Sequence, residues 1–185
     1  MSYPRVLACA ILALAALRLP YACTREDGPP SVEGVPRFQK VAEGLYRGGQ
    51  PTREGFEALR RMGIKTIVNL RAEHDEQALV KELGMNYVHI PLNSADRIPK
   101  EAIQTFFRVL ADREDQPVFV HCMRGADRTG VMVGLYRIAY EGWSADKAYE
   151  EARDLGMRWW HRELRHQLYE FSEMQEKTRN LKPRE

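Results

Sequence analysis

Residues 118–130 read VFVHCMRGADRTG, and this stretch decides the fold. The β-prone residues 118–121 predict a buried strand, Gly125 supplies the backbone angles of a tight turn, and a helix is expected from Gly130. In such a strand-loop-helix turn, successive backbone N–H groups point inward and the helix dipole adds positive potential. A dianion can then be held without a metal. The stretch therefore predicts a phosphate-binding cradle.

The rest of the chain alternates short β-prone stretches with helical ones. Strands are expected at 38–41, 45–47, 65–70, 87–90 and 118–121, and helices at 52–62, 73–83, 99–111, 130–140, 144–155 and 158–178. Strands separated by helices of these lengths predict an α/β fold, with a central, mostly parallel sheet flanked by helices on both faces.

The final helix carries an apolar pattern with three- and four-residue steps. A core stripe is expected from these positions: Trp160, Leu164, Leu168, Phe171 and Met174. Three arginines, Arg158, Arg162 and Arg165, lie off this stripe. A solvated helix face is the preferred interpretation of them, and a docking patch is the alternative.

The N-terminal region has the layout of an export signal. An unbroken apolar run, Val6 to Leu17, follows Arg5 and is too short to span a bilayer. Residues 1–23 are therefore predicted to be a signal peptide or a lipoprotein-type export segment, 24–37 a flexible linker, and 38–180 the catalytic domain. The protein is then exported, periplasmic or membrane-anchored, with lipidation of Cys23 as one means of tethering; a cytoplasmic location is the alternative.

Composition excludes several classes of protein. The chain has 28 Lys and Arg against 26 Asp and Glu, a net charge of +2, which is too even for a nucleic-acid binder. Cys122 is the only cysteine outside the N-terminal region, so no disulfide framework is expected. No metal or organic cofactor is predicted, because the sequence has no ligand-spaced His/Cys/carboxylate cluster, no Gly-Lys-Ser/Thr loop and no dinucleotide fingerprint.

Cys122 and Arg128 are the predicted catalytic pair. Their spacing puts a thiol at the floor of the cradle and a guanidinium at its rim, so that both act on one phosphoryl group. Thr129 is placed to donate its hydroxyl to the sulfur, and His121 is expected to orient the loop by bonding its backbone. The expected phosphate-binding loop consists of Met123, Arg124, Gly125, Ala126, Asp127 and Arg128.

Two charged residues of this loop have other expected roles. Asp127 is interpreted as a charge partner that positions basic groups around the loop. Arg124 either adds positive charge at the mouth or faces solvent.

The motif His121-Cys122-x5-Arg128-Thr129-Gly130 resembles the signature of the cysteine-dependent protein tyrosine and dual-specificity phosphatase superfamily. The stretch LYRGGQP at 45–51 and the segment Ala95-Asp96-Arg97 resemble the small atypical bacterial dual-specificity phosphatases, which include exported ones. This resemblance covers about residues 38–140. It implies a dual-specificity-phosphatase-like fold.

The resemblance also implies a general acid. Asp96 lies between an expected strand and helix, in the segment that matches the family's acid, so it is predicted to protonate the leaving oxygen. A helix cap is the alternative, and Asp112 and Asp115 are weaker candidates. Arg47 is interpreted as structural, tying down the N-terminal strand, and an approach to the site is the alternative.

The predicted function is phosphomonoester hydrolysis through a phosphocysteine intermediate. A protein tyrosine or dual-specificity phosphatase is the leading hypothesis, with a phosphorylated protein or a small phosphoester as substrate. The alternatives are an inositol phosphate or phosphoinositide phosphatase, a catalytically silent phosphate-binding module, and a sulfur transferase.

Overall fold

The computed structural model describes residues 31–93 and 96–181. Its sheet has five strands in the order β1-β2-β5-β3-β4. The strands are β1 (Gln39–Ala42), β2 (Leu45–Gly48), β3 (Thr66–Arg71), β4 (Asn86–Leu92) and β5 (Val118–His121). Only the β1–β2 pair is antiparallel, which confirms the predicted mostly parallel sheet.

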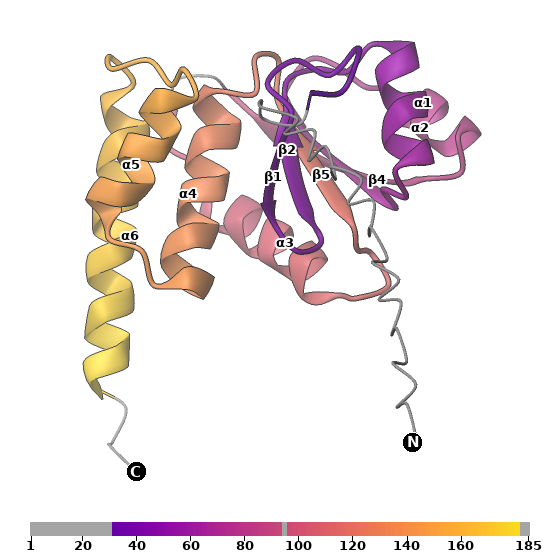
Figure 1. The fold of residues 1–185 in the computed structure, drawn as a ribbon. Helices are drawn as coiled ribbons and strands as arrows, with labels where there is room; N and C mark the ends of the chain where they lie inside the picture. The colour runs from indigo at the N-terminus through magenta and orange to yellow at the C-terminus, as the bar shows by residue number, and fades with distance from the viewer. Residues whose placement is uncertain (1–30, 94–95, 182–185) are drawn as a thin grey trace, which may run out of the picture.

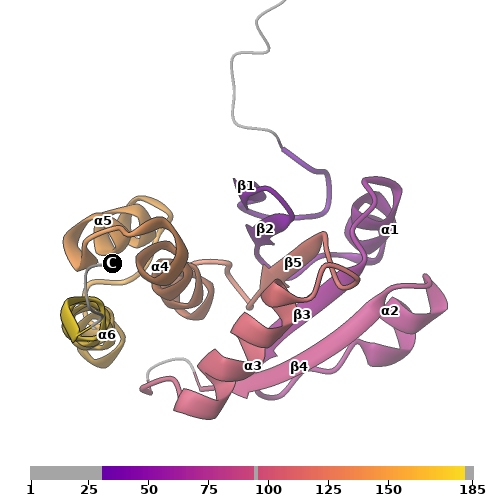
Figure 2. The ribbon, with the colours of Figure 1, turned by 90° about the horizontal axis from the view of Figure 1, so that it is seen from below.

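Helices cover both faces of this sheet, as Figures 1 and 2 show. They are α1 (Arg53–Arg61), α2 (Gln77–Glu82), α3 (Lys100–Ala111), α4 (Asp127–Glu141), α5 (Ala145–Asp154) and α6 (Arg162–Leu181). One core lies between the sheet and the layer of α3 and α4, with α5 and α6 packed behind α4. A second core lies under α1 and α2. The buried central strand β5 contributes to both cores, which fixes where its C-terminal end emerges.

Several element boundaries differ from the prediction. Helix α4 begins at Asp127, three residues before the expected Gly130, so Arg128 and Thr129 belong to its first turn. Helix α2 covers only Gln77–Glu82 of the expected 73–83. Helix α6 begins at Arg162, four residues later than expected.

The predicted core stripe of the last helix is wrong at its two ends. Leu164 and Leu168 are fully buried, but Trp160 and Met174 are 53% and 51% exposed. Trp160 precedes α6, so the helical period does not apply to it, and Met174 lies beyond the part of α6 that packs most deeply on α4.

The folded part starts earlier than the expected linker boundary at residue 38. Val35 is 5% exposed and belongs to the core under α1. The Thr52 amide donates to the Gly34 carbonyl at 2.9 Å, which ties this segment to the start of α1. The predicted export segment, 1–23, lies outside the described residues. Within the described ranges, no helix is both long and apolar enough to cross a membrane.

Candidate active site

The predicted nucleophile stands at the end of the central strand. All four residues of β5 are buried, and Cys122 follows them at 2% exposure as a free thiol. The helix α4 starts five residues later. The neighbouring strands β2 and β3 hold β5 in parallel register, so the loop at residues 122–126 is anchored at both of its ends.

Groups outside the loop donate hydrogen bonds to three of its carbonyl oxygens. The Gln50 amide donates to Met123 O at 3.2 Å, Arg37 Nη1 donates to Arg124 O at 3.1 Å, and Arg47 Nη2 donates to Gly125 O at 2.8 Å. These bonds turn three successive peptide units so that their carbonyls face away from the loop interior. Arg47 therefore approaches the site, which was the alternative considered for it, and its hydrogen bond there is to the loop backbone and not to the N-terminal strand.

The amide groups of the loop are correspondingly unoccupied. Among the described residues, none of the backbone N–H groups of residues 123–126 donates a hydrogen bond. Those of residues 127 and 128 lie in the first turn of α4, where an amide has no partner within its helix. Six amides, together with the positive end of the helix dipole, can therefore bind one anion.

Glycines let the loop pack against the turn that follows β2. Gly125 has φ +69°, and a Cβ on it would lie 2.3 Å from the carbonyl carbon of Gly48. A Cβ on Gly49 would lie 3.2 Å from the Arg124 carbonyl carbon. This contact explains why the LYRGGQP stretch accompanies the cysteine motif.

Arg128 is anchored by one of its nitrogens and free at another. Its Nη1 donates to Leu70 O at 3.2 Å and to Leu92 O at 2.9 Å, at the ends of β3 and β4. Its buried Nε has no hydrogen-bond partner among the described residues, and neither has Thr129 Oγ1. Two buried donors thus remain available in the first turn of α4, as a phosphate site requires.

His121 is positioned in part by a residue that the sequence did not reveal. Its Nε2 lies 2.8 Å from Glu76 Oε1, in a fully buried position, and its other polar contact is with the Cys122 backbone, in the loop where a backbone bond was predicted. Burial lowers the pKa of His121, and the Glu76 carboxylate opposes that shift. Glu76 is itself fixed by Asn69 Nδ2 at 3.0 Å. His121 is therefore a structural residue under the loop.

Asp127 links the loop to the segment between α5 and α6. Its Oδ1 accepts from the Arg158 amide at 2.8 Å, and its Oδ2 accepts from Arg124 Nη1 at 3.2 Å. Arg124 Nη2 also donates to Gly156 O at 3.4 Å. Asp127 is thus a charge partner, as predicted, and Arg124 is held by Asp127 and Gly156.

Asp96 lies on the loop that follows β4. It is exposed, and its Oδ2 accepts from Asn93 Nδ2 at 2.9 Å. The strand that carries this loop ends at Leu92, whose carbonyl holds Arg128. Among the described residues, Asp96 has no hydrogen bond to the cysteine loop, so its role as general acid stays a prediction.

The comparison with known families agrees with this geometry. Residues 30–158 match the family described as "DSP-PTPase phosphatase fused to NAD+ Kinase". The chain belongs to this family. It is a cysteine-dependent phosphatase of the protein-tyrosine and dual-specificity type, acting on phosphoesters.

Relatives of this phosphatase come from bacteria and plants. It is 29% identical over 159 residues to the dual specificity protein phosphatase TpbA of Pseudomonas aeruginosa, covering 82% of this chain and 72% of TpbA. It is also 29% identical over 144 residues to the inositol diphosphatase DSP3 of Arabidopsis thaliana, covering 74% of this chain and 68% of DSP3.

Solved structures share the fold. The catalytic core of the PP-IP phosphatase SIW14 from S. cerevisiae superposes with a TM-score of 0.65 at 24% identity, covering 82% of this chain and 98% of that one. The structure of P. aeruginosa TpbA superposes with a TM-score of 0.64 at 22% sequence identity, covering 76% of this chain and 91% of that one.

Sequence reasoning missed two residues that shape the phosphatase loop. Arg37 was placed in the linker, and Glu76 lies in a charged stretch that gave no sign of burial. Neither belongs to the cysteine motif. Over the parts of the chain that the structure describes, no group of three or more His, Cys, Asp or Glu side chains could hold a metal ion.

Proposed function

We propose that this phosphatase hydrolyses phosphate monoesters on proteins, phosphotyrosine first among them, with Cys122 as nucleophile. The observation that supports it is the loop around Cys122. Its carbonyls are held outward, and within residues 31–93 and 96–181 its amides donate to no acceptor and the buried Nε of Arg128 has no partner. This arrangement suits a tetrahedral dianion seated above a thiolate.

The reaction has two steps. The Cys122 thiolate attacks phosphorus in line and forms the S–P bond while the P–O bond to the leaving group breaks. Asp96 gives its proton to the departing oxygen. In the second step the Asp96 carboxylate takes a proton from water, the oxygen attacks phosphorus, and the S–P bond breaks to release phosphate and thiolate. Arg128 binds the equatorial oxygens bidentately in both steps.

Thr129 and the dipole of α4 steady the leaving thiolate. Thr129 Oγ1 is buried at the start of α4, and its free hydroxyl is proposed to donate to the sulfur. The helix dipole of α4 acts in the same direction because the loop ends at its N-terminus.

The name of one relative, and the content of one of its structures, support a protein substrate. TpbA is named a dual specificity protein phosphatase, and one TpbA structure is a complex with pTyr. That relative aligns with 82% of this chain. An aromatic phosphoester also suits the rim, where the Met123 side chain is exposed.

Inositol diphosphates are the second candidate substrate. DSP3 and DSP5 are named inositol diphosphatases, and SIW14 is named a PP-IP phosphatase. A polyphosphorylated ring would need several basic groups at the mouth. Arg124, the one basic residue predicted there from the loop, is held by Asp127 and Gly156, so this candidate is ranked second.

We also propose that the phosphatase works outside the cytoplasm. Support comes from the apolar run Val6–Leu17 behind Arg5, which has the composition of an export signal. Lipidation of Cys23 would tether the mature chain to a membrane. Fractionation of cells that express the full chain tests this proposal, and recovery of the unprocessed chain in the cytosol contradicts it.

The decisive experiment measures hydrolysis of p-nitrophenyl phosphate in EDTA by the full chain. We expect Cys122→Ser to be inactive and Asp96→Ala to lose about 100-fold in kcat, as loss of a general acid implies. Asp112→Ala removes a carboxylate from the turn before β5, at the other end of that strand, and should keep wild-type activity.

Other outcomes would favour the alternatives. Folded wild type without turnover would favour a phosphate-binding module, and turnover of thiosulfate instead would favour sulfur transfer. If Asp96→Ala keeps full activity, the acid lies elsewhere.

A further inference from the structure

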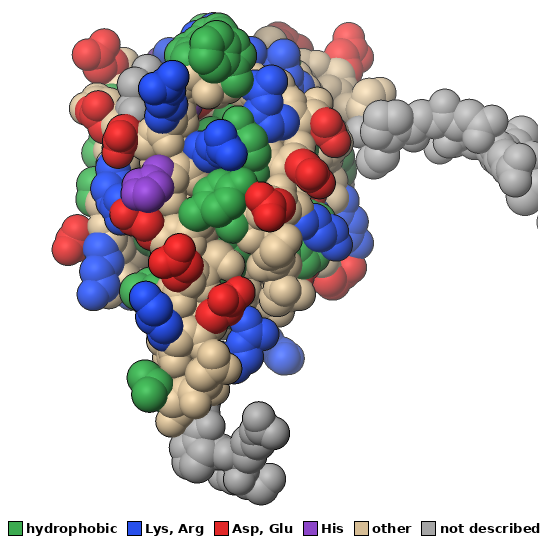
Figure 3. Space-filling view, turned by 90° about the vertical axis from the view of Figure 1, so that its left-hand side faces the viewer, with side chains coloured by type: hydrophobic (Ala, Val, Ile, Leu, Met, Phe, Trp, Pro, Cys, Tyr) green, Lys and Arg blue, Asp and Glu red, His purple; other side chains and the backbone are tan. Residues whose placement is uncertain are grey.

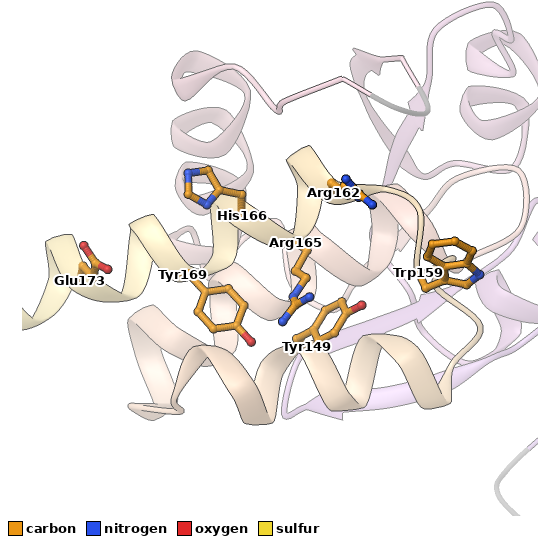
Figure 4. A pocket seen from close by; sticks show the side chains of 7 residues that line it. All are labelled: Tyr149, Trp159, Arg162, Arg165, His166, Tyr169 and Glu173. Atoms are coloured by element: carbon orange, nitrogen blue, oxygen red, sulfur yellow. The ribbon is translucent and has the colours of Figure 1, made fainter.

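A groove lies between α5 and α6 on the face shown in Figure 3. It has a volume of about 690 Å³, and Figure 4 shows the seven side chains that line it. Two of them are arginines, three are Tyr or Trp, one is His166, whose Nε2 lies 3.0 Å from Glu170 Oε1, and one, Glu173, is acidic. The groove is therefore cationic and aromatic, a composition typical of binding surfaces for polypeptides.

Two arginines of this groove and a third at its end have no carboxylate partner. Among the described residues, Arg158, Arg162 and Arg165 form no ion pair within 4.0 Å. Four other arginines do form such pairs: Arg53, Arg97, Arg124 and Arg137. The guanidinium groups of Arg158, Arg162 and Arg165 are thus not neutralised by a carboxylate within 4.0 Å among the described residues.

Aromatic rings hold two of these guanidinium groups in place. Arg165 lies 4.9 Å from the ring centre of Tyr149 and 5.5 Å from that of Tyr169. Arg158 lies 5.3 Å from the ring centre of Trp160. Stacking on a ring orders a guanidinium, and a guanidinium has five N–H donors, so the contact of Arg165 with Tyr169 leaves donors that can bind a carboxylate.

Two tryptophans at the end of the groove are exposed. Trp159 and Trp160 are 62% and 53% exposed, and their rings pack edge to face with 5.7 Å between the ring centroids. The sequence pattern had placed Trp160 in the core. Exposed tryptophans beside arginines are typical of interaction hot spots. The exposure of Trp160 therefore favours the docking patch, which was the alternative for these arginines, over a solvated helix face.

The groove starts at the active-site end of the molecule. Its Trp159 end belongs to the α5–α6 segment, which bonds Asp127 through the Arg158 amide, one residue before Arg128. Figure 1 shows this segment and the start of α4 at the same end of the fold. From Arg162 to Glu173 the groove follows α6 for about 16 Å, the length of about five extended residues.

We propose that this groove binds the acidic segment next to the phosphorylated residue of a polypeptide substrate. Carboxylates of that segment pair with Arg162 and Arg165, while its apolar groups pack on Trp159. Glu173 sets the far limit, because it repels acidic residues beyond the first few. The inference rests on the proposed protein phosphatase function and specifies its substrate class.

The test compares phosphotyrosyl peptides that differ only in the flanking residues, four Glu against four Lys, on either side of the phosphotyrosine. For the wild-type full chain we expect kcat/KM to favour a Glu-flanked peptide by about three- to tenfold, the size expected of two exposed ion pairs. The difference should lie in KM and should decrease with added salt.

The matched variants reverse the same number of charges. Arg162→Glu with Arg165→Glu should abolish or invert the preference while leaving p-nitrophenyl phosphate turnover within about twofold, which also shows that the variant folds. The control, Arg61→Glu with Arg113→Glu, changes exposed arginines that precede β3 and β5 at the opposite end of these strands, and should keep the preference.

Three results overturn the inference. One is equal turnover of both peptides by the wild type. Another is an unchanged preference in the Arg162/Arg165 variant. The third is loss, in that variant, of only inositol polyphosphate turnover or of only binding to phosphatidylglycerol vesicles. Failure of p-nitrophenyl phosphate turnover would instead contradict the proposed function itself.

Discussion

Arg47 is a buried cation that holds the phosphate loop from below. It is 1% exposed, and its Nη2 donates to Gly125 O at 2.8 Å. Burial lowers the pKa of Arg47 to about 10, while attraction to Glu151 and Cys122 opposes the shift. The side chain is therefore still protonated at neutral pH, and it adds positive potential close to the thiol.

Arg47→Met should impair catalysis more than folding. The substitution leaves the buried Gly125 carbonyl without its donor, at a cost of about 1–3 kcal/mol in the free energy of unfolding. A misplaced loop should lower kcat/KM for p-nitrophenyl phosphate by about 100-fold. Arg47→Lys should recover part of the loss because it restores a donor. Weakened inhibition by inorganic phosphate in parallel would show that the loop geometry is affected, whereas unchanged kinetics would contradict the positioning role.

His121 should make the stability of the phosphatase depend on pH. Its pKa is lowered by burial, so the folded state stays neutral while the unfolded chain takes up a proton near pH 6.5. The free energy of unfolding should thus fall as pH decreases below about 6.5, by up to about 1.4 kcal/mol per pH unit.

Urea unfolding at pH 7.5, 6.5 and 5.5 checks this expectation. His121→Asn should lose this part of the slope, and Glu76→Gln should keep it, because Glu76 acts against the shift. A slope that is the same in His121→Asn would assign the pH dependence to other groups.

At the scale of elements, the site depends on contact between two turns. The turn after β2 and the loop after β5 approach through Gly48, Gly49 and Gly125. The parallel pairing of β2 with β5 brings both turns to the same edge of the sheet. Neither turn would hold this geometry by itself.

Gly125→Ala should abolish phosphatase activity. The alanine would need φ +69° and would place its Cβ 2.3 Å from the Gly48 carbonyl carbon, so the loop must move. The matched control is Gly63→Ala, where φ is +86° and no atom lies within 4 Å. The control should cost about 1–2 kcal/mol in the free energy of unfolding and keep its activity. Equal loss of activity in both variants would rule out the contact as the cause.

At the scale of the whole molecule, α6 completes the core although the family match ends before it, at residue 158. Leu164 and Leu168 are fully buried, and the approach of α6 to α4 is close enough that a Cβ on Gly134 would lie 2.9 Å from Leu168 Cδ2. Because α4 carries Arg128 in its first turn, the packing of α6 also supports the active site.

Leu168→Ala should destabilise the protein by about 2–5 kcal/mol through loss of buried contacts and the cavity left behind. The control, Leu181→Ala, changes a leucine that is 83% exposed on the same helix and should stay within about 0.5 kcal/mol. Thermal unfolding measures both variants. Similar values for the two leucines would mean that α6 does not belong to the cooperative core.

The alternation of strands and helices, the mostly parallel sheet and the cysteine loop could all be predicted from the sequence. All three depend on local features of the sequence. For the cysteine loop these features are the apolar run before Cys122, the glycine within the loop, and the six-residue step to Arg128. Periodicity failed at both ends of the expected stripe: Trp160 precedes the helix, and Met174 lies within it but is 51% exposed.

Only the tertiary structure decided which distant groups surround the loop. Arg37, Arg47 and Glu76 act on residues 45 to 87 positions away in the chain, and strand order, not local sequence, brings them there. Similarly, the pattern marked Arg158, Arg162 and Arg165 as surface residues but did not show that none of them forms an ion pair among the described residues, or that Arg158 and Arg165 stack on aromatic rings. Local propensity and spacing fix an element and its motif, whereas burial, charge pairing and groove formation depend on contacts between elements, which exist only in the folded chain.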